Sequence, residues 1–313
     1  MRNRYFTLRI FMAFAVLAFG SRSMKSRVPD PPATVPVHTV VTVETRHGRE
    51  LPVIKAEDVQ VYQGRERLQV TDWVPLQGER GGLEFFILLD DASSATIGSQ
   101  FEDLREFMLS QPPTTAIGVG YMRDGAVDIA QNLTNDHALA ASKLRLPLGS
   151  LGAFASVYLS ISDLIKRWPE SALRREILVV SDGIDQFGGT GPANPYVDSV
   201  IEQAQRAGII IYAIYARGVG HYGHSFWRMN WGQNYLSQIA DETGGEAYFL
   251  GYETPVSFSP YLDDITRRLN HQYLLAFLAK PGKKGELQHF KIRTEVSNVE
   301  LVAPDRVYVP AGT

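Results

Sequence analysis

Three observations predict an α/β fold with a doubly wound, mostly parallel sheet. First, four nearly continuous apolar runs, at residues 83–89, 116–121, 177–181 and 209–215, have the character of strands covered on both faces by helices. Second, amphipathic stretches typical of helices lie at residues 101–109, 153–168, 197–207 and 235–243. Third, glycines that end helices precede two of the predicted strands, in Ala207-Gly208 and Thr243-Gly244-Gly245. This alternation predicts one α/β domain over residues 81–270.

The segments on either side of residues 81–270 are rich in predicted strands. Before the α/β domain, residues 37–44, 59–62 and 68–75 are β-branched or alternate in polarity, and after it residues 271–279, 287–296 and 299–309 do the same. We therefore expect residues 37–80 and 271–313 to pack together as a small sandwich-like β unit. Residues 21–36 are rich in proline and are predicted to form a linker.

The first twenty residues have the pattern of a secretory signal peptide. Three arginines precede an apolar run at residues 10–19, and the small residues Ala18 and Gly20 precede Ser21. The pattern predicts cleavage near Ser21 and a secreted, periplasmic or cell-envelope protein, with no membrane span afterwards. An uncleaved anchor and a buried N-terminal helix are the alternatives. The chain has no cysteine, which excludes disulfides, a thiolate nucleophile and a lipoprotein anchor.

Composition and motifs argue against two large functional classes. A net charge of -3 without a basic stripe excludes an extended nucleic-acid interface. The chain lacks phosphate-cradling glycine loops, a His-Glu-x-x-His helix and a Gly-x-Ser-x-Gly elbow. Ser94, Asp182 and His221 could be combined as a hydrolase set, but any long sequence supplies such triplets. We therefore do not expect an enzyme.

Polar residues follow two of the predicted strands, where ligands bind in open α/β sheets. Asp90-Asp91-Ala92-Ser93-Ser94 follows the first strand, and Ser181-Asp182-Gly183 follows a later one. In these motifs and in element order, residues 83–270 resemble the von Willebrand factor type A (vWA) family. The flanking segments, with residues 56–62 before the domain and Tyr273-Leu274-Leu275 after it, resemble the bacterial vWFA-related subgroup.

The resemblance implies a metal-ion-dependent adhesion site. In the family, an Asp-x-Ser-x-Ser motif, a Thr and a late Asp surround a divalent cation, which prefers oxygen ligands. The matching residues are Asp90, Ser94 and Asp182, whereas Ala92 and Ala153 replace two hydroxyl ligands. The expected cofactor is therefore none, or Mg²⁺ bound weakly with help from Asp91, Ser93 or water. Alternatively, the aspartates cap loop and helix amides.

The segment after residues 209–215 is the predicted partner-binding surface. Residues 217–231 read as a long loop that carries side chains typical of protein interfaces. The candidate contacts are His221, Tyr222, Phe226, Trp227, Arg228 and Trp231. In the alternative interpretation, the aromatic side chains fold back onto the core as a lid. His221 and His224 alone do not make a metal site, because no third ligand is evident.

These inferences predict an exported protein that binds another protein at the carboxyl end of its sheet, beside a degenerate metal site. A metal-dependent adhesin and a scaffold that binds nothing remain as alternatives. The sequence does not identify the partner.

Overall fold

The structure of the protein is a computed structural model, and it describes residues 34–48, 51–149, 156–171, 174–185, 187–188, 191–219 and 225–312. The predicted signal peptide and most of the predicted linker lie outside these residues. The first strand begins at Val35, so the last two residues of the predicted linker are already strand.

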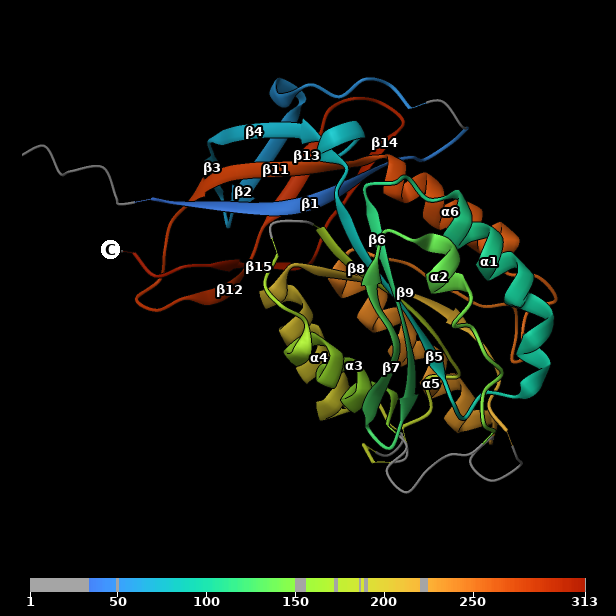
Figure 1. The fold of residues 1–313 in the computed structure, drawn as a ribbon. Helices are drawn as coiled ribbons and strands as arrows, with labels where there is room; N and C mark the ends of the chain where they lie inside the picture. Colours follow the sequence, from blue (N-terminus) through green and yellow to red (C-terminus); the bar gives the residue numbers. More distant parts are fainter. Residues whose placement is uncertain are drawn as a thin grey trace, which may run out of the picture. The chain divides into compact units, whose positions relative to one another are not determined.

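A six-stranded sheet forms the centre of the α/β domain (Figure 1). Its strand order is β10 (Ala247–Tyr248), β9 (Ile209–Tyr215), β8 (Arg174–Ser181), β5 (Leu83–Asp90), β6 (Thr115–Arg123) and β7 (Ala126–Thr134). All neighbouring pairs are parallel except β6 and β7. The sequence analysis did not predict β7, which follows a tight turn at Asp124 and Gly125, both with positive φ.

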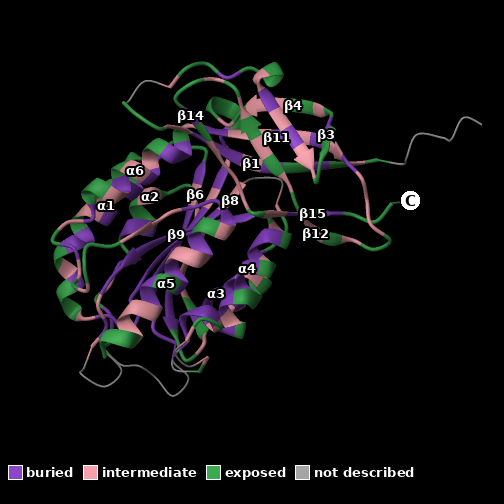
Figure 2. Ribbon diagram, turned by 180° about the vertical axis from the view of Figure 1, so that it is seen from behind, coloured by how far each residue is buried: buried purple, intermediate pink, exposed green. Residues whose placement is uncertain are grey.

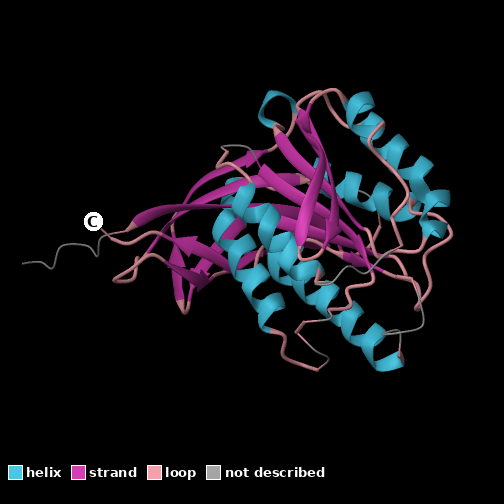
Figure 3. Ribbon diagram, turned by 60° about the horizontal axis from the view of Figure 1, so that its bottom comes forward, coloured by secondary structure: helices cyan, strands magenta, loops and turns pink. Residues whose placement is uncertain are grey.

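Helices cover both faces of this sheet, as Figure 3 shows. Helices α1 (Phe101–Ser110), α2 (His137–Ala141) and α6 (Ser259–Asn270) pack on one face. Helices α3 (Val157–Arg167), α4 (Pro195–Ala207) and α5 (Phe226–Thr243) pack on the other. Strand β5 shows why its run is apolar throughout, because Phe85 and Ile87 enter one core and Phe86 and Leu88 enter the other. The prediction of a doubly wound, mostly parallel sheet is therefore confirmed.

The segments that flank this domain form the expected antiparallel β unit. One sheet has the order β14 (Val299–Val302), β1 (Val35–Thr45), β11 (Gln272–Ala279) and β4 (Val70–Pro75). Another has the order β13 (Lys291–Thr294), β2 (Val59–Gln63) and β3 (Glu66–Leu68), and β12 (Glu286–His289) pairs with β15 (Arg306–Val309). Short 3-10 turns lie at Ala56–Asp58, Gly78–Arg80 and Ala95–Gln100.

The β unit has its own apolar core, to which strands from both ends of the chain contribute. Val41 from β1 and Phe277 from β11 are fully buried there, and the buried strand residues form the purple bands in Figure 2. Three predicted strands are each divided in two. Residues 299–309, for example, are interrupted around Pro304, which lacks the amide donor that a continuous ladder needs.

Candidate functional site

The carboxyl ends of strands β5 and β8 bring Asp90 and Ser181 together, because these two strands are neighbours in register. The Ser181 hydroxyl donates a hydrogen bond of 2.7 Å to Asp90 Oδ2, and the Ala92 amide donates one of 2.9 Å to Asp90 Oδ1. Both oxygens of this buried carboxylate therefore already accept a hydrogen bond from the protein. We call the end of the sheet where β5, β8, β9 and β10 finish the carboxyl edge.

Burial, together with the nearby carboxylate of Asp182, raises the pKa of Asp90 to about 7, against the hydrogen bonds from Ser181 and Ala92. A carboxyl group in this environment holds a proton at pH values where an exposed aspartate is fully ionised. The ionised form of Asp90 is therefore disfavoured by burial and by a second carboxylate, and is favoured by two hydrogen bonds.

Asp182 is likewise engaged with the backbone. Its Oδ1 accepts a hydrogen bond of 2.9 Å from the Ile184 amide, and its Oδ2 accepts one of 3.2 Å from the Gly218 amide. These bonds tie the loop after β8 to the loop after β9. This arrangement is the capping role that the sequence analysis gave as the alternative to metal binding.

The remaining positions of the predicted metal motif supply few free oxygens. The Ser94 hydroxyl accepts bonds from the amide and the hydroxyl of Thr96, at 3.4 and 3.0 Å, and caps the short helix that follows. Ser93 is buried, and its hydroxyl has no hydrogen-bond partner within the described part of the chain. Ala92 carries no side-chain oxygen, and Ala153 lies outside the described residues.

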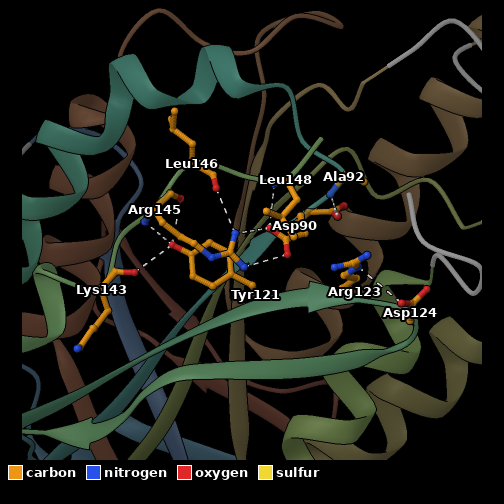
Figure 4. Close-up of polar contacts among 10 residues, drawn as sticks. Asp90, Ala92, Tyr121, Arg123, Asp124, Lys143, Arg145, Leu146 and Leu148 are labelled. Carbon is orange, nitrogen blue, oxygen red and sulfur yellow. Dashed lines mark hydrogen bonds and ion pairs between the residues drawn. The ribbon is translucent and has the colours of Figure 1, made fainter. Parts of the chain in front are cut away.

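Asp91 forms an ion pair that the sequence analysis missed. Its two oxygens accept hydrogen bonds from Nη1 and Nη2 of Arg145, at 2.7 and 3.0 Å. The guanidinium lies 3.6 Å from the centroid of the Tyr121 ring, and Arg145 donates from its amide to the Tyr121 hydroxyl (Figure 4). The Asp91 side chain is 2% exposed and that of Arg145 is 37% exposed, so a protein cation neutralises this carboxylate beside the predicted metal position.

The described residues fit a hexacoordinate Mg²⁺ poorly. Such an ion needs several oxygens converging on one point, with water completing the shell. Here Asp90 and Asp182 direct their oxygens to protein donors, Asp91 faces Arg145, and Ser94 acts as a helix cap. Within the described part of the chain, no group of three or more acidic or histidine side chains is arranged to hold a metal ion.

The predicted partner-binding loop is partly a helix, which corrects the sequence analysis. Helix α5 begins at Phe226 rather than near Tyr235, because the Ser225 hydroxyl caps it by accepting from the Arg228 amide. Phe226 and Trp227 are 56% and 69% exposed, so neither folds back as a lid.

The other predicted contacts differ from this exposed pair. Trp231 packs against the core with its ring stacked on Tyr235, at 6.0 Å between centroids, which agrees with the alternative interpretation for this one residue. Arg228 is half-buried in the first turn of α5. His221 and Tyr222 lie outside the described residues.

A cleft of about 440 Å³ opens at the carboxyl edge beside Ser94. It is lined by Ser94, Thr96, Arg217, Gly218, Val219, Glu253 and Thr254. Arg217 and Glu253 form an ion pair in its wall, and the Arg217 amide donates to the Thr254 hydroxyl. The sequence analysis did not identify residues 249–256, which reach the site through the loop after β10.

No protein-family model and no curated protein matches the chain. Among solved structures, an aerotolerance-related membrane protein from Bacteroides fragilis is 15% identical, with a TM-score of 0.45, and covers 60% of this chain and 99% of its own. A von Willebrand factor type A protein from Catenulispora acidiphila is 9% identical, with a TM-score of 0.44, and covers 90% and 74%. The vWF domain of the type V pili tip protein Mfa5 from Porphyromonas gingivalis is 13% identical, with a TM-score of 0.42, and covers 64% and 96%.

The α/β domain is vWA-like in fold. The mostly parallel sheet between two helical layers is the arrangement that the sequence resemblance implied, whereas the strand order and the antiparallel edge strand β7 were not predicted. At identities of 9 to 15%, the similarity to solved structures concerns the fold.

Proposed function

We propose that this chain is an exported vWA-like protein that binds a polypeptide partner at the carboxyl edge of its sheet, and that it does so without a bound divalent cation. The proposal assigns no catalytic step to the protein. The contact is made by exposed apolar and aromatic side chains of the loops and helix ends at this edge.

The distribution of exposed apolar side chains carries the proposal. Twelve large apolar side chains are exposed among the described residues, and eight of them lie at the carboxyl edge. The eight are Leu146, Leu148, Phe187, Phe226, Trp227, Phe249, Leu250 and Val256. Exposed apolar side chains scattered singly need no explanation, but a concentration at one edge is typical of an interaction surface.

Part of this surface is held in place. The Phe226 ring contacts the rings of Trp227 and Tyr252, at 5.7 and 5.6 Å between centroids, and so links the start of α5 to the loop after β10. The Gln233 side chain donates to the Gly251 carbonyl in the same loop. A preformed aromatic surface loses little conformational entropy on binding, which favours affinity.

The ion pair between Asp91 and Arg145 supports the metal-free form of the proposal. A partner's carboxylate binds a metal-dependent site through the cation's open position. Here the cation nearest the strand end belongs to Arg145 and is already paired with Asp91. The apolar surface around it is then the feature that remains to hold a partner.

Export rests on the N-terminal sequence pattern, since those residues lie outside the described part of the chain. Among the described helices, none is long and apolar enough to cross a membrane. Mass spectrometry of the exported protein tests this part of the proposal. We expect a mature chain that begins near Ser21, whereas an intact Met1 in the exported protein would show that the segment is not cleaved.

Site-specific photocrosslinking tests the contact itself. Trp227 and, in a separate chain, Leu250 are replaced by p-benzoylphenylalanine, and each variant is expressed in an exporting host. Leu109 provides the matched control, because it is 55% exposed but lies near the C-terminal end of α1 and does not belong to the carboxyl edge. We expect one discrete protein adduct from positions 227 and 250 and not from 109.

The Phe226→Ser variant sharpens this experiment. Because Phe226 is exposed, the substitution should leave the melting midpoint unchanged while it reduces the adduct at position 227. Absence of an adduct from both edge positions, or an equal adduct from position 109, would contradict the proposal. The first of these results would favour a scaffold that binds nothing at this edge.

A further inference from the structure

A second cavity, of about 750 Å³, lies at the opposite end of the sheet, between the amino-terminal ends of β8 and β9 and the β unit. Its walls come from β1, from the C-terminal ends of α3 and α4, from the start of β8 and from β15. Figure 1 shows these helix ends beside β12 and β15. We call this cavity the basic groove, for the residues described next.

Cations dominate the charge of the basic groove. Five basic side chains line it, and a single carboxylate, Glu170, does so as well. The five are Lys166, Arg174, Arg175, Arg206 and Arg306. This balance contrasts with a net charge of -3 for the chain as a whole. The groove is therefore a local positive field on a mildly acidic protein.

Carboxylates within the protein offset part of this charge, at Arg174, Arg175 and Arg206. Arg174 donates to the carbonyls of Leu269 and Gly81, at 2.9 and 3.1 Å, and its buried Nε has no partner among the described atoms. Arg175 donates to the carbonyl of Ala207. Carbonyl oxygens satisfy these donors, while the carboxylate of Glu176 attracts Arg174 and those of Glu84 and Glu170 attract Arg175.

The other three cations are more accessible. Arg206 pairs with Glu202 at 2.9 Å, and its guanidinium lies 5.6 Å from the centroid of the Tyr308 ring. Lys166 and Arg306 form no ion pair with any carboxylate in the described part of the chain. These two side chains stand on different walls, at the end of α3 and in β15.

We propose that the basic groove binds an acidic segment of a partner polypeptide. The cations come from four elements and alternate along the walls with apolar side chains such as Val40, Trp168 and Leu274. A small anion needs donors that converge on one point, whereas spaced cations and apolar contacts match a segment carrying both acidic and apolar residues. The occupant is another polypeptide, because residues 21–33 of this chain carry three cations and only one carboxylate.

This site is independent of the carboxyl edge. The basic groove lies at the amino-terminal ends of the strands, and none of its lining residues belongs to the apolar surface at the other end. The protein would then contact polypeptides at two places, one apolar and one electrostatic. An experiment that disproves binding at one of the two sites therefore does not disprove binding at the other.

Fluorescence anisotropy with a defined peptide tests the inference on the full chain. The probe is a fluorescein-labelled peptide of alternating glutamate and leucine. The double variant Lys166→Gln/Arg306→Gln removes the two cations that form no ion pair with a described carboxylate and leaves the other three basic side chains unchanged. We expect it to weaken binding about tenfold, as the loss of two partly desolvated ion pairs should. Binding should also weaken as salt rises from about 0.05 to about 0.3 M.

The matched control is Arg65→Gln/Arg67→Gln, which removes the same charge from an exposed turn of the β unit. We expect it to bind the peptide as the unaltered chain does. Equal weakening by the control variant, or no binding at low salt, would overturn the inference. An oligodeoxynucleotide of equal charge that binds as tightly as the peptide would also overturn it, because the groove would then be a general polyanion site.

Discussion

Asp90 and Asp91 are adjacent in the sequence but lie in opposite electrostatic environments. Asp91 is paired with Arg145, whereas Asp90 is buried near the carboxylate of Asp182 and forms no ion pair with any cation in the described part of the chain. The side chains of consecutive residues at a strand end point to different sides, so one faces the loop that carries Arg145 and the other faces β8. Two chemically identical side chains therefore make contributions of opposite sign to stability.

Replacing each aspartate by asparagine tests this difference. A carboxyl whose pKa rises on folding binds its proton more tightly in the folded state, so its contribution to stability falls as pH rises from about 4 to about 7. Asp90→Asn keeps the hydrogen-bonding shape and removes the charge. We expect it to raise the free energy of unfolding at pH 8 by on the order of 2 kcal/mol, and by a smaller amount at pH 5.

Asp91→Asn is the matched control, because it removes a carboxylate that is paired. We expect it to lower the free energy of unfolding at pH 8 by about 1 to 3 kcal/mol, since Arg145 loses its partner. Denaturant titrations of the three proteins at pH 5 and pH 8 measure both effects. Destabilisation by Asp90→Asn at pH 8 would contradict this expectation, because it would mean that the ionised carboxylate is stabilised, for example by a bound cation.

The sequence placed these residues at the ends of strands, but it did not identify the side chains that they contact. Asp90 and Asp182 follow apolar runs, and parallel neighbouring strands bring such ends together. Arg145 is separated from Asp91 by 54 positions and lies in an irregular segment, so no local pattern pointed to the pair. Ser94 was placed correctly at the edge, but the sequence could not show whether its hydroxyl would face a metal or cap a helix.

At the scale of elements, helix α5 is fixed to the loop after β8 by two glycines. A Cβ on Gly232 would overlap the carbonyl oxygen of Asp182, and a Cβ on Gly183 would overlap the carbonyl oxygen of Gly232. Gly183 also has a φ of 69°, which side chains other than glycine rarely adopt. The close approach positions the first turn of α5, and with it Phe226 and Trp227, at the carboxyl edge.

Gly232→Ala should therefore displace the helix from the strand end. We expect a loss of about 1 to 3 kcal/mol in the free energy of unfolding, because the clash is with backbone and not with a movable side chain. Asn234→Ala, at an exposed position on the same helix, should change it by less than about 0.5 kcal/mol. Thermal or denaturant unfolding measures both. Equal stability of the two variants would mean that α5 is not held against this loop.

The start of α5 shows what limited the prediction of elements. Its first two turns mix the apolar residues with Arg228, Asn230 and Gly232, and they follow a run rich in glycine, so the segment was interpreted as a loop. The capping role of Ser225 was the available local pattern that indicated the helix start. The strands with two buried faces were predicted closely because their apolar runs are short and unbroken and alternate with amphipathic stretches.

At the scale of the molecule, a buried arginine links the α/β domain to the β unit. Arg268 on α6 is 8% exposed and contacts Glu44 from β1, Glu246 before β10 and Asp264 on its own helix. Burial raises the pKa of Glu44 and of Glu246, against the attraction of the arginine. One cation thus offsets the negative charge of three carboxylates at the contact between the α/β domain and the β unit.

Removing this cation should destabilise the contact strongly. We expect Arg268→Met to lower the free energy of unfolding by about 3 to 5 kcal/mol at pH 7, and by less at pH 5, where Glu44 and Glu246 can take up protons. Arg267→Met, an exposed neighbour that also contacts Asp264, should cost less than about 1 kcal/mol. A similar cost for the two variants, by denaturant unfolding, would mean that Arg268 does not hold the two parts together.

The overall architecture followed from the alternation of apolar runs and amphipathic stretches, and from the β-rich character of both flanks. The packing of the two flanks against each other was inferred because both are β-rich and flank one α/β domain, but the pairing of β1 with β11 and its register along residues 35–42 could not be foreseen. The basic groove escaped prediction for the same reason, since Lys166 and Arg306 are far apart in the sequence and only the fold brings them to one cavity.

Thermal unfolding with and without Mg²⁺, Mn²⁺ or Ca²⁺ tests most directly the claim that the carboxyl edge works without a bound cation. We expect no shift of the melting midpoint with any of the three ions, in the unaltered chain or in Asp90→Ala. A site occupied at a hundredfold excess over its dissociation constant would add about 2.7 kcal/mol and raise the midpoint by several degrees. A rise of that size that disappears in Asp90→Ala would contradict the claim and identify a metal-dependent adhesin.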